Sequence, residues 1–279
     1  MIPSFYNFVN KLILFVLFIS CTLSTFASIE IFPTSSRSAA MGRCSVALKG
    51  FWGIQNNPAA ISSIEKFSFG INYESRFNLK ETSYKNVAVI APLNFGVLGL
   101  SYNHYGYKLY NEQKIGMAYA RSFGKIISIV VQLDYLSVSL AENYSNKQNI
   151  TFEIGLQSEI IENLRIGIYT FNPIMVKLSK TNEEKIPSIL RVGMAYYMNN
   201  KFIITSEIEK SNYIKPIIFR CGLEYSIKSK FFIRTGIASR YEIFTLGFGV
   251  SFRHLKIDMA ATMHESLGFS LQMGLIFNL

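Results

Sequence analysis

The chain has 279 residues, of which 49% are hydrophobic and 16% charged, and its formal net charge is +10. A typical soluble domain carries about 25% charged residues, so this composition argues against a fully hydrated surface. After residue 30 no apolar run reaches the roughly 18 residues of a spanning helix, which argues against a helical membrane protein. The combination favours a membrane β-barrel.

The first 27 residues have the features of a secretory signal. Lys11 supplies the positive charge, an apolar run follows, and Ala27 ends a small-residue cleavage site. We therefore expect a signal peptide over residues 1–27. The alternative is a lipoprotein signal that is cleaved before Cys21 and acylated there, although Phe18 stands where leucine is usual.

Cysteine usage and charge indicate no specific cofactor or partner. Only Cys44 and Cys221 follow the signal, far apart and in different contexts, so a disulfide is unsupported. No metal-ligand spacing occurs, and we expect no cofactor. Removal of Lys11 leaves 27 minus 18, or +9, a charge that suits an anionic surrounding such as lipid headgroups.

From Phe67 onward apolar residues alternate with polar or small ones, which is the period of strands with two different faces. The last thirteen residues show the pattern best. One face there carries Leu267, Phe269, Leu271, Met273, Leu275, Phe277 and Leu279. The other face is polar or small, and only Ile276 interrupts it. One face suits lipid and the other suits water.

The pattern predicts an all-β fold, a 14-stranded antiparallel transmembrane β-barrel with an amino-terminal hatch or plug. Most strands exceed the about 9 to 11 residues that cross a bilayer at a tilt, and closure leaves no unpaired edge in hydrocarbon. A soluble β-sandwich would also alternate, but it would have to cover many apolar outer faces with a second layer. The predicted strands lie near 67–78, 82–92, 94–104, 111–121, 125–138, 148–160, 163–173, 188–198, 201–210, 216–226, 229–238, 242–253, 255–264 and 267–279.

The connections between these strands alternate in length. Those after even-numbered strands are short, whereas the longest, 139–147 and 172–187, follow odd-numbered strands. Bacterial barrels have short periplasmic turns and longer outer loops, so we expect an outer-membrane location with both termini periplasmic. The predicted organisation is a signal peptide over 1–27, a periplasmic or luminal hatch over 28–66 and the barrel over 67–279.

Charged residues on the polar faces are expected inside the barrel. Paired charges that brace the interior are the favoured interpretation, and a polar path or binding surface is the alternative. The predicted luminal polar network comprises Asp134, Glu153, Arg165, Arg191, Arg220, Glu224, Arg234, Arg253, Lys256 and Asp258. Tyrosines near strand ends suit the membrane interfaces, namely Tyr73, Tyr84, Tyr105, Tyr107, Tyr110, Tyr196 and Tyr197.

Residues 38–62, SAAMGRCSVALKGFWGIQNNPAAIS, precede the strands and contain the only tryptophan. A barrel of this width needs a segment that fills its lumen. Asn57 is suited to a turn, Pro58 fixes the backbone, and the two alanines that follow can start a short helix. We expect this segment to be the hatch, with Trp52, Asn56, Asn57 and Pro58 as gating candidates.

These features resemble the amino-terminal hatch of the FadL-like outer-membrane barrels, and more closely their PorV/PorQ branch. The matched stretches are 39–42, 46–48 and, most specifically, Asn57-Pro58-Ala59-Ala60. Phrases at strand ends extend the resemblance over nearly the whole mature chain, at 98–102, 132–135, 171–173 and 264–269. Arg43 and Cys44 depart from the pattern, because small residues are more usual there.

The resemblance implies two unlike activities. A PorV/PorQ protein would be a type IX secretion-associated or related envelope scaffold, with exported proteins or secretion-machinery subunits as partners of loops 139–147 and 172–187. A FadL-like conduit would admit a hydrophobic ligand from outside, with the hatch around Trp52 and Asn57 controlling its escape. In both cases outer-membrane lipid surrounds the barrel.

Two further classes are disfavoured. His104, His254 and His264 lie in separate segments and no hydrolase motif accompanies them, so we do not expect an enzyme. Basic residues alternate into the predicted lumen or lie in turns instead of forming one exposed stripe, so we expect no nucleic-acid partner.

Overall fold

The computed structural model describes residues 31, 33–124, 126–140, 146–177, 186–199, 201–240 and 242–279. The predicted signal peptide over 1–27, with the alternative lipidation site at Cys21, lies outside the described residues. Residues 141–145 and 178–185, which belong to the two long connections expected on the outside, also lie outside them.

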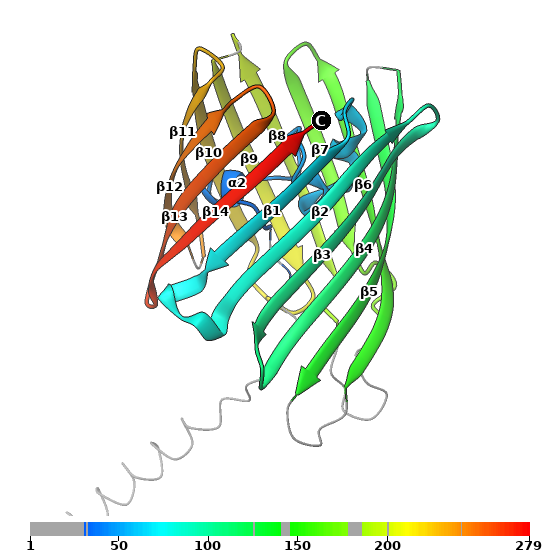
Figure 1. Cartoon of the computed structure of the whole chain (residues 1–279), viewed down its shortest axis with the longest axis vertical. Coiled ribbons are helices and arrows are strands. Elements are labelled where there is room, and N and C mark those ends of the chain that lie inside the picture. The colour runs from blue at the N-terminus through cyan, green and yellow to red at the C-terminus, as the bar shows by residue number, and fades with distance from the viewer. Residues whose placement is uncertain are drawn as a thin grey trace, which may run out of the picture.

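Fourteen antiparallel strands form a closed barrel in which each strand pairs with its sequence neighbours (Figure 1). β14 pairs with β1, from Ser68 opposite Asn278 to Ser75 opposite Leu271. The predicted fold and strand number are confirmed. The strands are β1 (Ser68–Ser75), β2 (Ser83–Leu93), β3 (Gly96–Tyr107), β4 (Tyr110–Phe123), β5 (Ile127–Leu140), β6 (Lys147–Ile161), β7 (Leu164–Phe171), β8 (Ile189–Met198), β9 (Phe202–Ser211), β10 (Ile218–Ile227), β11 (Phe231–Ala238), β12 (Glu242–Ser251), β13 (Leu255–His264) and β14 (Gly268–Asn278).

The two ends of the barrel differ. Six connections of two or three residues each lie at the end where β1 starts and β14 finishes, here called the turn end. At the opposite loop end the connections range from two residues, 108–109, to seventeen, 172–188. Asn163 and Asn199 have φ angles of 68° and 51° at the turn end, a left-handed conformation that asparagine tolerates.

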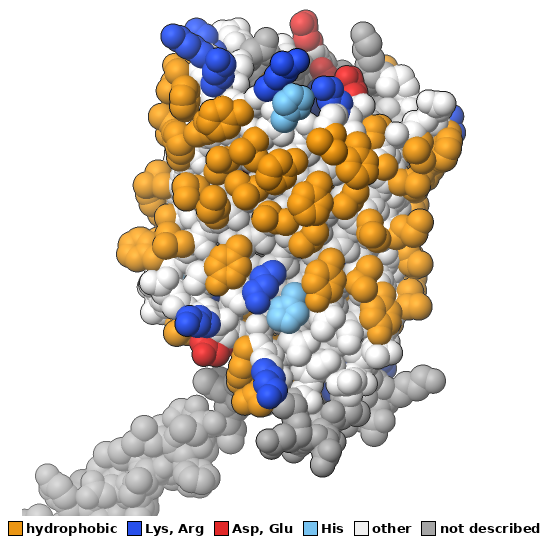
Figure 2. Space-filling view, in the orientation of Figure 1, with side chains coloured by type: hydrophobic (Ala, Val, Ile, Leu, Met, Phe, Trp, Pro, Cys, Tyr) orange, Lys and Arg blue, Asp and Glu red, His pale blue; other side chains and the backbone are white. Residues whose placement is uncertain are grey.

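The outer face is apolar around the middle of the barrel (Figure 2). Leu100, Met117, Leu133 and Leu271 are each more than half exposed there. Lysine, arginine and histidine side chains gather toward both ends of the face in view. Because successive side chains of a strand point to opposite faces, the residues between these apolar ones point into the lumen.

The described residues before β1 fill the interior, as the blue segment within the barrel in Figure 1 shows. They form α2 (Ser36–Ala39), α3 (Gly53–Asn56) and the 3-10 helix η1 (Pro58–Ser63), and we call residues 33–64 the hatch. The Asn57 side chain caps η1 by accepting from the amide of Ala59. Two more 3-10 helices, η2 (Arg76–Asn78) and η3 (Lys80–Thr82), lie between β1 and β2. Among the described helices, none is long and apolar enough to cross a bilayer.

Candidate functional site

The first part of the hatch, residues 33–48, is held by polar contacts with the wall formed by β6–β14 and β1, and Met41 and residues 46–48 also join a buried hydrophobic cluster. Glu207 of β9 makes the most concentrated contact, because its Oε2 accepts hydrogen bonds from the amides of Ser45 and Val46, both at 2.8 Å. A carboxylate that receives two backbone donors fixes the chain at that point. We call residues 33–48 the anchored segment.

Arg43 occupies a position where the resemblance leads one to expect a small residue. Its φ angle is 60°, a left-handed conformation that is strained for residues other than glycine. The guanidinium donates to Glu74 Oε1 at 2.6 Å and to the carbonyl of Pro33 at 2.8 Å. Arg43 therefore supplies a buried ion pair between the hatch and β1.

Asn57 is fully buried and connects the two parts of the hatch to the wall. Its Nδ2 donates to the carbonyl of Val46 at 2.8 Å and to those of Leu156 and Ile168 at 3.2 and 3.3 Å. A Cβ atom added at Gly155 of β6 would lie 2.1 Å from Asn57 Oδ1. The close approach of this side chain to the wall thus requires glycine.

A row of side-chain amides crosses three neighbouring strands. Ser36 donates from its amide and its hydroxyl to Asn72 Oδ1, at 3.1 and 2.8 Å. Asn72 Nδ2 donates to Asn86 Oδ1 at 3.1 Å, and Asn86 Nδ2 in turn donates to Asn103 Oδ1. Asn103 Nδ2 donates to Gln55 Oε1 at 2.7 Å. The row begins and ends on hatch residues, so it links α2 to α3 through β1, β2 and β3.

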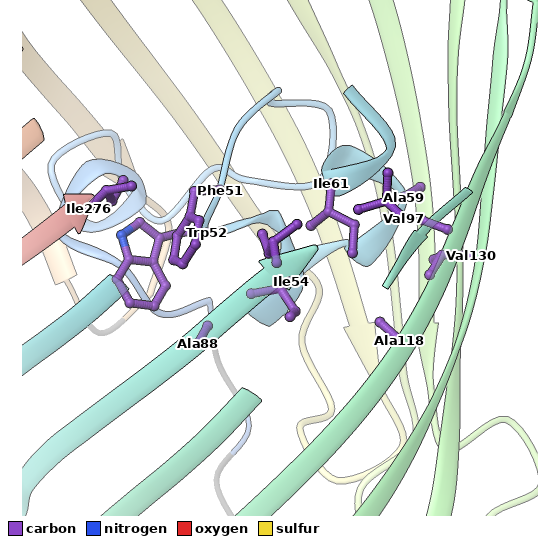
Figure 3. Close-up of a cluster of buried hydrophobic side chains, with 12 residues drawn as sticks. Phe51, Trp52, Ile54, Ala59, Ile61, Ala88, Val97, Ala118, Val130 and Ile276 are labelled. Carbon is purple, nitrogen blue, oxygen red and sulfur yellow. The ribbon is translucent and has the colours of Figure 1, made fainter. Parts of the chain in front are cut away.

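The second part of the hatch, residues 51–64, meets the wall mainly through apolar side chains (Figure 3). This segment contains no charged residue. Ile276, which interrupts the polar face of the last strand, packs here, and this contact explains the exception. We call residues 51–64 the apolar segment. The cluster comprises Phe51, Trp52, Ile54, Ala59, Ile61, Ala88, Ile90, Val97, Ala118, Ala120, Val130 and Ile276.

Four charged residues form one buried cluster on β8, β9 and β10. Arg191 Nε lies 2.7 Å from Glu209 Oε2. Arg220 Nη1 lies 3.0 Å from the same oxygen and 3.2 Å from Glu207 Oε1. The charges balance within the cluster, and the removal of any member would leave a buried charge without compensation.

A second cluster joins the hatch to β10, β11 and β13. Glu224 Oε2 accepts from Arg37 Nε at 2.8 Å and from Arg234 Nε at 2.6 Å. Arg234 Nη1 donates to Asp258 Oδ1 at 2.7 Å. The pair between Arg37 and Glu224 spans 187 residues of sequence, so it ties the hatch to a distant part of the wall.

Two smaller sets complete the charged interior. Lys114 Nζ contacts Glu153 Oε1 and lies 3.7 Å from Asp134 Oδ1. Arg165 Nη2 lies 3.2 Å from Glu159 Oε2 near the turn end. The interior is thus cross-braced between strands.

Two members of the predicted network differ from the rest, all of which are paired. The placement of Arg253 in the lumen is wrong, because β12 ends at Ser251 and Arg253 is exposed in the turn before Leu255. Lys256 does face inward, with its ammonium 4.8 Å from the centre of the Phe232 ring. No hydrogen bond or ion pair of Lys256 occurs among the described residues.

The gating candidates all lie inside the hatch. Trp52, Asn56 and Asn57 are 5%, 3% and 0% exposed. Pro58 is the first residue of η1. Asn56 Oδ1 accepts from the amide of Thr34 at 2.9 Å. Movement of these residues stays a prediction.

The tyrosines predicted for the membrane interfaces divide into two sets. On the outer face, Tyr73, Tyr107 and Tyr196 are exposed. For four others the prediction is wrong, because strand alternation places them on the luminal side with residues such as Asn86 and Asn103. These are Tyr84, Tyr105, Tyr110 and Tyr197.

Several functional residues were missed from the sequence. Glu207, Glu209 and Lys114 follow the same alternation as the predicted luminal residues, so a complete count of inward positions would have found them. Arg37 and Arg43 carry no comparable signal, because their partners depend on how the hatch lies within the barrel.

Thiols and histidines do not gather into a site in the described part of the chain. Cys44 is buried and Cys221 is exposed, and both are free. No group of three or more His, Cys, Asp or Glu residues there could hold a metal ion. His254 lies in the turn between β12 and β13, whereas His264 ends β13 at the opposite end of the barrel.

Two cavities lie inside the barrel on opposite sides of the hatch. One of about 190 Å³ is near the turn end, beside Lys49 and Asn278, and one of about 20 Å³ is toward the loop end, beside Tyr84 and Glu112. A hollow of about 740 Å³ lies on the outer face next to Leu246. Since hatch residues line both inner cavities, the hatch separates them.

The geometry defines a closed barrel whose lumen is occupied by its own amino-terminal segment. No family model matches the sequence, and no curated protein matches it either. Solved structures match over nearly their whole length, which makes the fold that of the FadL/TodX-like 14-stranded barrels.

Three of these similar structures illustrate the likeness. A CymD monoaromatic hydrocarbon channel is 12% identical with a TM-score of 0.64, and 91% of this chain covers 99% of it. The Pseudomonas putida toluene transporter TodX is 12% identical with a TM-score of 0.65, at 90% and 99% coverage. A FadL homologue of Pseudomonas aeruginosa is 10% identical with a TM-score of 0.61, at 90% and 98% coverage. Such identities establish the fold alone and do not distinguish a PorV/PorQ branch.

Proposed function

We propose that the protein is an outer-membrane β-barrel with its turn end in the periplasm. The apolar outer face supports a bilayer location, and a closed sheet satisfies every backbone group in hydrocarbon. Short turns at one end and longer loops at the other match the usual orientation of such barrels. In this orientation the end of β14 is periplasmic, whereas Ile31 lines the cavity on the loop side of the hatch.

We further propose that this barrel is a conduit for hydrophobic small molecules. The observation that carries the proposal is the apolar seam between residues 51–64 of the hatch and the wall of β2–β5 and β14. A neutral hydrocarbon loses no hydrogen bond in such a seam and gains from the burial of its surface. Described channels of this fold include ones for monoaromatic hydrocarbons and toluene, which supports this class of cargo.

Passage requires a local movement, because the hatch separates the two inner cavities. The apolar segment is the part suited to move, since it has no charged residue to pull from a partner. The anchored segment would stay in place through Glu207, Arg43 and Arg37. The proposed path therefore runs along one side of the lumen.

Toluene uptake tests the conduit. We would measure uptake by Gram-negative cells that produce the protein, its Ile54→Ala variant, or a control Ile189→Ala variant. Both isoleucines are buried, at 0% and 3% exposure, but Ile189 lies in the other hydrophobic cluster. Loosening the seam at Ile54 should raise uptake several-fold, whereas the Ile189 change should leave it near the parent value.

Two outcomes would contradict the conduit. Toluene uptake no faster than that of cells without the protein would show that the barrel is not a toluene conduit. Equal uptake by the Ile54→Ala and Ile189→Ala variants would show that toluene does not pass along the seam. Folding of each variant is checked by heat-dependent mobility on gels, so that loss of the barrel is recognised.

A second proposal follows the PorV/PorQ resemblance, in which the barrel is a type IX secretion-associated or related scaffold for exported proteins. It is favoured by the many polar contacts that fix the anchored segment, because a scaffold needs a rigid plug. A gentle-detergent pull-down from outer membranes would test it. Co-purification of secreted proteins or secretion-machinery subunits, unaffected by Ile54→Ala, would support the scaffold over the conduit.

A further inference from the structure

The cavity of about 190 Å³ near the turn end has one apolar and one polar side. Phe51, Trp52 and Ile276 form its apolar side, and Figure 3 shows Phe51 and Trp52 lying together with Ile276 close by. Lys256 and Ser45 contribute to the polar side. A cavity of roughly 150 Å³ accommodates benzene, so this one has room for a single ring with a small substituent.

Hydrogen-bond donors around this cavity lack partners among the described residues. Lys256 has neither a hydrogen bond nor a carboxylate within ion-pair distance. The Trp52 indole nitrogen and the Ser45 hydroxyl, in two residues that line the cavity, are also unpaired, but both atoms are themselves buried, so Lys256 is the donor that reaches the cavity. Buried donors without partners are uncommon in folded proteins and call for an explanation.

The acceptors that line the same cavity are already engaged. Asp258 Oδ1 accepts from Arg234 Nη1 at 2.7 Å. Asn56 Oδ1 accepts from the hatch backbone at 2.9 Å, and Asn278 Oδ1 accepts from the Ser68 hydroxyl at 2.9 Å. The cavity thus offers a free ammonium, whereas the three side-chain acceptors named above each already receive a hydrogen bond, and this balance favours an anion.

The other two cations that line the cavity, Arg37 and Lys49, are already paired with carboxylates. Arg37 is paired with Glu224 at 2.8 Å, and Lys49 is paired with Glu159 at 3.3 Å. Lys256 is therefore the cation of the cavity that has charge to offer. Its backbone lies opposite Ile276 in the pairing of β13 with β14, and its ammonium extends over β12 to 4.8 Å from the centre of the Phe232 ring, so a ligand held there would extend from the ammonium toward Ile276.

We propose that this cavity binds a compact organic acid, with its carboxylate at Lys256 and its apolar body against Phe51, Trp52 and Ile276. The inference goes beyond the proposed conduit, because a neutral hydrocarbon has no charge for Lys256 to meet. Binding is measured apart from uptake, so either proposal can fail alone.

Fluorescence of Trp52 provides a direct assay, since it is the only tryptophan of the chain. The purified protein in detergent would be titrated with benzoate, with benzyl alcohol as the uncharged analogue of similar size, and with inorganic phosphate as charge without a ring. We expect a saturable fluorescence change with benzoate. Benzyl alcohol and phosphate should each bind at least about tenfold more weakly, the equivalent of one lost charge-assisted hydrogen bond.

Three variants locate the site. Lys256→Gln should weaken benzoate binding by about tenfold or more, Lys256→Arg should retain it, and Lys201→Gln should leave it unchanged because Lys201 is exposed at the turn end outside the cavity. If Lys256→Gln does not fold, the affinities of the Lys256→Arg variant for benzoate, benzyl alcohol and phosphate still test the proposal. Equal binding of benzyl alcohol or phosphate, or benzoate binding unchanged by Lys256→Gln, would overturn the proposal.

Discussion

The two parts of the hatch lie in one lumen, and both pack against it through apolar side chains, but only the first is also held by ion pairs. The anchored segment, residues 33–48, meets the wall through Glu207, through the pair of Arg43 with Glu74 and through the pair of Arg37 with Glu224. The apolar segment, residues 51–64, meets it through a hydrophobic cluster and through the uncharged hydrogen bonds of Gln55 and Asn57. One plug therefore combines a fixed side with a side that can be repacked.

The difference matters because the two kinds of contact respond differently to displacement. A buried ion pair that loses one partner costs about 3–5 kcal/mol, since the remaining charge stays out of water. Apolar contacts are lost in small steps of about 0.8 kcal/mol for each methylene group uncovered. Any motion that opens the lumen should therefore begin in the apolar segment.

The largest effect is expected at Glu207. Glu207→Ala removes the acceptor of two hatch amides and a partner of Arg220, and it should lower the free energy of unfolding by about 3–5 kcal/mol. Urea unfolding in detergent, followed by Trp52 fluorescence, measures this change. Glu265→Ala, at an exposed position in the β13–β14 connection, is the control and should change stability by less than about 0.5 kcal/mol.

The Cys44 thiol lies next to the Glu207 contact, so its reactivity measures the release of the hatch at that point. Burial, aided by the charge of Glu207, raises the pKa of the Cys44 thiol well above its ordinary value, so it should resist alkylation in the folded protein. With Cys221→Ser as background, Glu207→Ala should make Cys44 react at lower urea. Unchanged stability together with unchanged Cys44 reactivity would show that Glu207 does not anchor the hatch.

An intermediate effect is expected from one substitution made on each side. A Cβ added at Gly236 would lie 2.1 Å from the backbone nitrogen of Gly42, whereas one added at Gly99 would lie 2.5 Å from the tip of Ile54. Backbone cannot yield as a side-chain tip can, so Gly236→Ala should destabilise by about 3 kcal/mol and Gly99→Ala by about 1 kcal/mol. The same urea titration compares them. Equal losses would mean that the two sides are equally rigid.

The alternation of residues made the barrel predictable from the sequence. Period two placed Asp134, Glu153 and Arg234 on the luminal face, and the same rule applied to β9 would have added Glu207. It failed at Arg253, because β12 ends two residues earlier than predicted. Alternation is a local property of each strand, so it does not report where a strand stops.

The contacts between the hatch and the barrel wall could not be predicted from alternation. Ile276 breaks the alternation of β14 because the hatch covers it, and that contact joins residues more than two hundred positions apart. Asn57 was expected to support a turn, but its bonds to the carbonyls of Leu156 and Ile168 depend on the absence of a side chain at Gly155. Contacts of this kind arise only when the segment and the closed wall are placed together.

The smallest expected effect is the difference between two substitutions of Arg43, which separates backbone strain at this residue from the attraction of its ion pair. Arg43→Gly and Arg43→Ala both remove the ion pair with Glu74, but only alanine keeps a Cβ at the φ of 60°. The glycine variant should therefore be the more stable of the two by about 1 kcal/mol, although both fall below the parent. Unfolding in urea resolves the order. Equal stability of the two variants would mean that the backbone at residue 43 relaxes in the alanine variant. The expected order would show that the backbone at Arg43 is strained, and that this strain accompanies the ion pair with Glu74 of β1.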